Sequence, residues 1–275
     1  MDWTVLQSRL VQKPNQTHCT VVDLGVIEYQ RAWTLQEEYS LEISRGERPP
    51  TLLLLEHHHV YTFGRKGRAE NLLWGEQQLK ERGVVVHWVD RGGDVTYHGP
   101  GQLVGYPLVP LGRVSDGASV GELSGEYGGN ASSPRIPAAD YVGYVRKLER
   151  TLIIALARLG LPSGQQPRLT GVWVQGDVYS RCPRCRPQDR QRPAKIAAIG
   201  VKVDVRGISR HGFALNVNPD MTYWDGINAC GLTGHPIVSL ADLLRPVPEM
   251  HRVKMEVAAA FGEVFGYEIR APAWQ

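Results

Sequence analysis

The sequence has few of the features that mark specialised classes of protein. Its four cysteines are too few for a disulfide framework in 275 residues. No apolar run approaches the roughly 18 to 20 residues that a membrane-spanning helix needs, and the N-terminus resembles neither a signal peptide nor a transit peptide. The net charge of +3 is too small to indicate nucleic-acid binding. These absences predict a cytoplasmic globular protein without nucleic-acid or membrane partners.

A complete metal-binding motif is also missing. Cys182 and Cys185 form a Cys-Pro-Arg-Cys sequence, which is half of a zinc knuckle, but no second pair of ligands follows at a suitable spacing. The three consecutive histidines at 57–59 would alternate between opposite faces in an extended chain, so they would not converge on one ion. Two reduced thiols in a surface loop are therefore favoured, and we expect no metal.

The hydrophobic pattern is that of one α/β domain. A hydrophobic fraction of 42% and a length of 275 residues suit a single large core. Runs typical of strands and stretches with helical periodicity follow one another without strict alternation. The strand-like runs are 20–24, 51–56, 60–63, 84–89, 171–174, 195–205, 211–217 and 267–270, and the clearest helical stretches are 28–45, 140–160 and 251–265. Segments 112–137 and 176–193 are predicted to be surface insertions, the first because it is rich in glycine and serine. We predict one domain over residues 1–275, of α+β type, with a mixed β-sheet flanked by helices.

Two residues far apart in the sequence suit nucleophilic catalysis. Cys230 precedes Gly231, which would leave its sulfur accessible and its neighbouring amides free to bind an oxyanion. A free thiol has a pKa of about 8.5, so it needs a nearby cation to ionise at neutral pH. Lys195 begins an otherwise apolar strand of small residues and could supply that cation. Alone, Cys230 could equally be a small core residue and Lys195 a solvent-facing residue of an edge strand.

A third segment, from Arg91 to Gln102, combines four glycines with several polar side chains. Glycines allow a ligand to approach main-chain amides closely, and successive amides in a loop can bind an anion or a carbonyl oxygen. A tight turn between strands, with a core tyrosine, is the alternative. The segment from His211 to Asn216 could form the opposite wall of a narrow apolar pocket, whose first wall includes Ala198.

Together these segments resemble the signatures of the lipoyl(octanoyl) transferases. The matching sequences are RGGDVTYHGPGQ at 91–102, KIAAIG at 195–200, HGFALN at 211–216 and the Cys230-Gly231 pair. The resemblance implies the biotin/lipoate protein ligase fold. It also implies transfer of octanoyl from octanoyl-acyl carrier protein to a lysine of a lipoyl domain, in 2-oxoacid dehydrogenases or the glycine cleavage H protein, without a cofactor.

The resemblance further assigns roles to individual residues. Cys230 would carry the acyl thioester, and Lys195 would activate it and transfer protons. The positions that match the family's substrate-binding stretches are Arg91, Gly92, Gly93, Asp94, Val95, Thr96, Tyr97, His98, Ala198, Ile199, Gly200, Gly212, Phe213 and Ala214.

Other activities remain compatible with the residues. An ATP-dependent lipoate or biotin ligase would share the fold, but it needs no nucleophilic cysteine. An amidotransferase that moves octanoyl between lipoylated proteins would differ only in its donor. A non-catalytic zinc protein built around Cys182 and Cys185 is disfavoured because the second half of its motif is missing.

Overall fold

The computed structural model describes residues 18–111, 140–176, 182, 184–185, 187–189, 191–229 and 235–272. Cys230, all of the insertion predicted at 112–137 and eight of the 18 residues of the insertion predicted at 176–193 lie outside these ranges. The larger of two sheets has the strand order β11-β1-β2-β6-β10-β9-β8-β7. These strands are β1 (His18–Ile27), β2 (Thr51–His57), β6 (Gln102–Leu108), β7 (Gly164–Gln166), β8 (Leu169–Val174), β9 (Ala194–Val203), β10 (Ser209–Asn216) and β11 (Glu268–Arg270).

The larger sheet is mixed, as predicted. Strand β1 runs parallel to both of its neighbours, β11 and β2. From β2 onward each pairing is antiparallel, including the hairpin of β9 and β10, which correspond to the strand-like runs predicted at 195–205 and 211–217. A smaller sheet of β4 (Val85–Trp88), β3 (Val60–Phe63) and β5 (Val95–His98) lies beside it. The smaller sheet was not anticipated, because part of the segment 91–102 was expected to be a loop.

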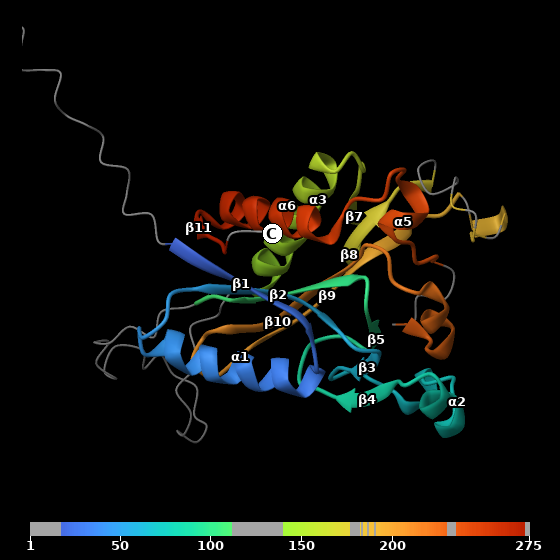
Figure 1. The fold of residues 1–275 in the computed structure, drawn as a ribbon, viewed down its shortest axis with the longest axis horizontal. Helices are drawn as coiled ribbons and strands as arrows, with labels where there is room; N and C mark the ends of the chain where they lie inside the picture. Colours follow the sequence, from blue (N-terminus) through green and yellow to red (C-terminus); the bar gives the residue numbers. More distant parts are fainter. Residues whose placement is uncertain are drawn as a thin grey trace, which may run out of the picture.

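Helices cover both faces of the larger sheet (Figure 1). Helix α1 (Tyr29–Ser44) lies on one face, and α3 (Tyr141–Arg158) and α6 (Met250–Phe265) pack together on the other. The shorter helices are α2 (Glu76–Glu81) and α5 (Leu240–Leu243). No helix in the described ranges is long and apolar enough to cross a membrane.

Helix α3 shows how local sequence sets these elements. The Asp140 side chain accepts a hydrogen bond from Gly143 N at 2.7 Å and caps the N-terminus. Gly160 follows the last turn with φ of 87°, a conformation that favours glycine. Between these ends, Leu148 and Leu152 are fully buried on the stripe predicted from the helical period.

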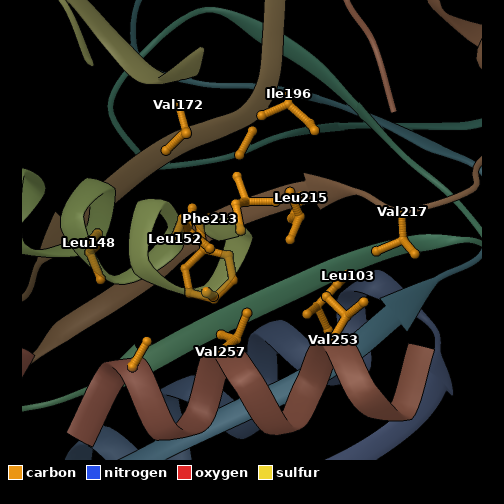
Figure 2. Packing of buried hydrophobic residues seen from close by; sticks show 14 of the residues in the cluster. Leu103, Leu148, Leu152, Val172, Ile196, Phe213, Leu215, Val217, Val253 and Val257 are labelled. Carbon is orange, nitrogen blue, oxygen red and sulfur yellow. The ribbon is translucent and has the colours of Figure 1, made fainter. Parts of the chain in front are cut away.

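The two faces of the sheet bury different clusters. On the face covered by α3 and α6, Phe213 and Leu215 of β10 pack among helix side chains such as Leu152 and Val257 (Figure 2). Ala214, between them, faces the α1 side, as the alternation of a strand requires. This alternation leaves small side chains toward α1, where the candidate site lies. The single-domain extent and the two insertions stay predictions, because 112–139 and most of 177–190 are not described.

Candidate active site

A cavity lies where the α1 face of the β9–β10 hairpin meets the glycine-rich segment and the N-terminus of α1. It encloses about 530 Å³, part of it open to solvent. Its lining residues are Tyr29, Arg91, Gly93, Thr96, His98, Tyr106, Lys195, Ala198, Ile199, Gly200, His211, Gly212, Phe213 and Ala214.

The floor of the cavity consists of small residues on two paired strands. Ala198 lies opposite Ala214, and Gly200 lies opposite Gly212. At Gly200 a Cβ would lie 2.9 Å from Gly92 O and 3.1 Å from Arg91 Cδ, so only glycine lets the 91–93 segment approach the strand this closely. The result is a slot whose floor has little side-chain bulk and which segment 91–93 borders at Gly200.

Lys195 reaches this slot because of a β-bulge. Strand β9 pairs with β8 so that Ala197 lies opposite Val172 while Lys195 lies opposite Trp173, which leaves Ile196 as an extra residue. Ile196 and Ala197 consequently both pack in the core on the α3 face, whereas Lys195 lines the cavity. In a regular strand Lys195 would share the face of Ala197. The bulge therefore puts the lysine in the cavity.

The ammonium of Lys195 lies against an aromatic ring and a glycine. Its Nζ is 4.8 Å from the ring centroid of the fully buried Trp173, a cation–π distance. A Cβ on Gly171 would lie 3.2 Å from Lys195 Cε. These contacts hold the lysine at the cavity mouth.

The chain that follows segment 230–234 is anchored beside this lysine. Pro236 O accepts a hydrogen bond from Lys195 N at 2.8 Å, and the His235 ring meets Trp173 edge-on at 5.2 Å between centroids. Before the segment, Asn228 N donates to Asn71 O at 2.8 Å, and Ala229 packs against the aromatic cluster around Tyr61. Cys230 itself lies outside the described residues, whereas residues 228–229 before it and 235–236 after it have these contacts.

The other end of the slot is polar. Arg91 is almost fully buried, and its NH2 donates to Thr62 O at 2.5 Å and to Thr62 Oγ1 at 2.9 Å. His211 has a φ of 55°, which is strained for a residue other than glycine. Its main-chain N–H donates to Gln36 Oε1 of α1 at 2.7 Å, which supports this conformation.

A hydrogen bond to Asp90 orients the imidazole of His211. Its Nε2 lies 2.8 Å from Asp90 Oδ1. Burial alone would raise the pKa of Asp90, but hydrogen bonds from His211 and Lys202 outweigh it and hold the pKa well below its usual value. Burial also lowers the pKa of His211 despite Asp90. We therefore assign a neutral imidazole whose Nε2–H donates to the carboxylate.

Two further buried histidines lie close to the cavity. His98 lies 2.8 Å from Gln102 Oε1 through its Nδ1, and burial lowers its pKa well below the usual value. Burial also lowers the pKa of His57 to about 4. The Nε2 of His57 lies 2.8 Å from the hydroxyl of Tyr106, and its Nδ1 lies 2.9 Å from Ile27 O. Because a main-chain carbonyl can only accept, His57 donates from Nδ1 and accepts the Tyr106 hydroxyl. Both histidines are thus neutral near pH 7.

Most of the residues predicted for the site meet at this cavity. Those that line it are Arg91, Gly93, Thr96, His98, Lys195, Ala198, Ile199, Gly200, Gly212, Phe213 and Ala214. Gly92, Asp94, Val95 and Tyr97 do not. Asp94 instead accepts a hydrogen bond from Asn71 at 2.6 Å, and Tyr97 is a core residue that stacks on Tyr223. The alternating faces of β5 separate Thr96 and His98 from Val95 and Tyr97.

Sequence reasoning did not single out Tyr29, Tyr106 or His211 as site residues. His211 could have been included, because it directly precedes Gly212 in a segment already predicted as a wall. Tyr29 and Tyr106 carry no local signal, since they reach the cavity from the start of α1 and from β6. In the described ranges no group of three or more histidine, cysteine or acidic residues could hold a metal ion.

The chain resembles known proteins over most of its length. It matches the lipoyl protein ligase A/B catalytic domain over residues 28–123 and 130–262. An octanoyltransferase of Rubrobacter xylanophilus is 41% identical over 244 residues, which cover 88% of this chain and 91% of that protein. An octanoyltransferase of Chloroflexus aurantiacus is 40% identical over 254 residues, covering 92% of this chain and 97% of that protein.

Solved structures agree on the fold. A bipartite lipoate protein ligase from Thermoplasma acidophilum superposes with a TM-score of 0.59 at 15% identity, covering 94% of this chain and 86% of that one. Lipoate-protein ligase A bound with ATP gives a TM-score of 0.60 at 15% identity, covering 94% and 88%. At this identity the likeness concerns the fold alone. It confirms the predicted lipoate ligase architecture of a mixed sheet flanked by helices.

Proposed function

Because this chain belongs to the family of the lipoyl protein ligase A/B catalytic domain, we propose that it transfers an octanoyl group to a lipoyl-domain lysine in protein lipoylation. Relatives that are about 40% identical over most of both chains are octanoyltransferases, which supports this acyltransferase activity. The narrow slot with a floor of alanine and glycine suits an unbranched acyl chain.

In this proposal Cys230 is the nucleophile and Lys195 activates it. The observation that carries it is the seating of Lys195 at the cavity, with Pro236, close after segment 230–234, hydrogen-bonded to its main chain. An ammonium at this place would favour a nearby thiolate over the thiol. An acyl group on that sulfur would then extend along the slot from Lys195 toward Gly200.

The reaction would run in two acyl transfers. The thiolate of Cys230 attacks the thioester carbonyl of the donor, and the donor thiol leaves with a proton from Lys195. The amine of the acceptor lysine then gives a proton to Lys195 and attacks the acyl-cysteine, which releases the thiolate. One thioester replaces another in the first step, and a more stable amide forms in the second. The chemistry therefore consumes no nucleotide and needs no cofactor.

The donor is proposed to be octanoyl-acyl carrier protein. The acceptors would be lipoyl domains of 2-oxoacid dehydrogenases and the glycine cleavage H protein. The family and its relatives support an acyl donor and a lipoyl-domain acceptor in general. The cytoplasmic location expected from the sequence stays a prediction.

The decisive experiment is intact mass spectrometry after incubation with octanoyl-acyl carrier protein. We expect one octanoyl adduct that hydroxylamine removes and that peptide mapping places on Cys230. Cys230→Ser should fold but form no adduct, while the matched Cys185→Ser should acylate normally. Transfer that proceeds at the wild-type rate in Cys230→Ser would refute the covalent route.

The same assay separates the proposal from a nucleotide-dependent ligase. Such a ligase shares this fold, since lipoate-protein ligase A bound with ATP superposes with a TM-score of 0.60. Octanoylation of a lipoyl domain from the carrier thioester, with no nucleotide added, supports transfer. A strict requirement for ATP and free octanoate would instead identify a ligase.

A further inference from the structure

Helix α3 carries a buried carboxylate that has no part in the chemistry above. Glu149 is fully buried, although glutamate rarely is unless it is paired. Its Oε2 accepts a hydrogen bond from Arg146 NH1 at 2.6 Å. Its Oε1 points the other way and accepts from the main-chain N–H of Gly171 at 3.0 Å. A buried charge costs stability unless its oxygens are satisfied, and here both are.

The main chain that Glu149 binds lies directly under the side chain of Lys195. Gly171 has φ of +120°, which other residues rarely adopt. A Cβ there would lie 2.6 Å from Ala197 O and 3.2 Å from Lys195 Cε. The aliphatic part of the Lys195 side chain thus passes over β8 at Gly171, where β8 has no side chain. The hydrogen bond from Gly171 N to Glu149 holds this part of β8 in place.

The next two residues of β8, Val172 and Trp173, also position the side chain of Lys195. The bulge that turns Lys195 toward the cavity is located between Val172 and Trp173. The ring of Trp173 then meets the ammonium at 4.8 Å. Gly171, Val172 and Trp173 are consecutive, and the bulged residue Ile196 of β9 lies opposite the Val172–Trp173 step, so an anchor on Gly171 N limits movement of the β8 segment that pairs with the bulge. Glu149 is that anchor, and it comes from a different helix.

We infer that Glu149 is a positioning residue for Lys195, acting through the main chain of Gly171. The inference rests on the proposed catalytic role of Lys195. The carboxylate is paired with Arg146 at 2.6 Å, and the effect that we infer is on the geometry of the Gly171 main chain. Glu149 and Gly171 do not line the cavity, so acyl binding should not depend on them.

Two substitutions of Glu149 distinguish the effect of losing the acceptor oxygen from the effect of losing the negative charge. Glu149→Gln keeps an oxygen for Gly171 N–H and removes the charge. Glu149→Leu fills similar space without an acceptor, and Glu149→Met is the second such variant if the first does not fold. Asp23→Asn is the matched control, because Asp23 pairs with the buried Lys254 at 2.7 Å on another part of the sheet.

We expect Glu149→Leu to lower kcat by about 30-fold or more with KM within about twofold, since a displaced catalytic group costs up to about 100-fold. Glu149→Gln should keep kcat within about threefold of the wild type. Asp23→Asn should lose stability and keep both constants.

The pH dependence of Cys230 alkylation gives an independent readout. In the wild type the ammonium of Lys195 should hold the midpoint below the usual thiol value of about 8.5. Glu149→Leu should raise the midpoint toward that value, whereas Glu149→Gln and Asp23→Asn should leave it where it is.

Three outcomes would count against the inference or its premise. A wild-type midpoint and kcat in Glu149→Leu, or in Glu149→Met where that variant replaces it, overturns the positioning role. Equal loss in Glu149→Gln and Glu149→Leu also overturns it, because the charge would then matter and the acceptor would not. An ordinary thiol midpoint in the wild type itself refutes the role of Lys195 and thereby the proposed function, whatever the Glu149 variants do.

Discussion

Replacing Gly171 by alanine tests most directly whether the β8 main chain at Gly171 positions the Lys195 side chain. The substitution adds one methyl group, yet the backbone at this position has φ of +120° and the added carbon would lie 2.6 Å from Ala197 O. It would also lie 3.2 Å from Cε of Lys195. The strand or the lysine must therefore move.

The expected magnitude has two parts. Holding a non-glycine residue at such a φ costs on the order of 1–3 kcal/mol, and relieving the overlap with backbone costs a further amount of about 1–3 kcal/mol. We expect the free energy of unfolding to fall by roughly 2–6 kcal/mol. A shift of the lysine by about 1 Å would lower kcat/KM by about 100-fold.

Gly160→Ala is the matched control. Gly160 also has a positive φ, of +87°, but a Cβ there meets nothing within 4 Å. The free energy of unfolding of Gly160→Ala should fall by about 1–2 kcal/mol from backbone strain alone, and the variant should keep its activity. Denaturant unfolding followed by circular dichroism and steady-state octanoyl transfer would be measured on both variants. If Gly171→Ala keeps the wild-type kcat/KM and is destabilised no more than Gly160→Ala, Gly171 does not position the Lys195 side chain.

Two further predictions concern the acyl slot and the buried histidines. Ala198→Leu should narrow the slot and shift preference from octanoyl to hexanoyl donors: losing two buried methylenes costs about 1.6 kcal/mol, or roughly 15-fold in kcat/KM for octanoyl. Competition between the two carrier thioesters measures this, and an unaltered preference would contradict it. The second prediction is acid sensitivity, because burial lowers the pKa of His57 to about 4. Between the unfolded pKa of about 6.5 and this value only the unfolded state binds the proton, so stability falls as pH falls. The free energy of unfolding should drop by about 1.6 kcal/mol from pH 6.5 to pH 5, with a slope that approaches about 1.4 kcal/mol per pH unit below pH 6. Guanidinium titrations that give equal stability at both pH values would disprove it.

Many of the helices and strands could be predicted, because local sequence patterns specify them. The apolar stripe of α3 and its Asp140 cap specify that helix without reference to the rest of the chain. The continuous apolar run at 51–56 predicts a strand buried on both faces, and β2 lies within the larger sheet between β1 and β6. The hairpin of β9 and β10 follows from two strand-like runs with Gly207 between them.

The candidate site was only partly predictable for a related reason. Glycine-rich and small-residue segments indicate a close approach of backbone and ligand, and Gly93, Ala198 and Gly212 do line one cavity. The pattern does not tell which side chains of such a segment face that cavity. Asp94 and Tyr97 turn away from it, toward Asn71 and Tyr223.

By itself, the sequence determined the order and type of the main elements, the family, and the residue types available for catalysis. Only the tertiary structure decided that Lys195 faces the slot, because that depends on a bulge between β8 and β9 that no local period reveals. It also decided that Glu149 supports Gly171 and that Tyr29 lines the cavity. The physical reason is that periodicity sets which residues share a face within one element, whereas register and packing between distant segments set what that face meets.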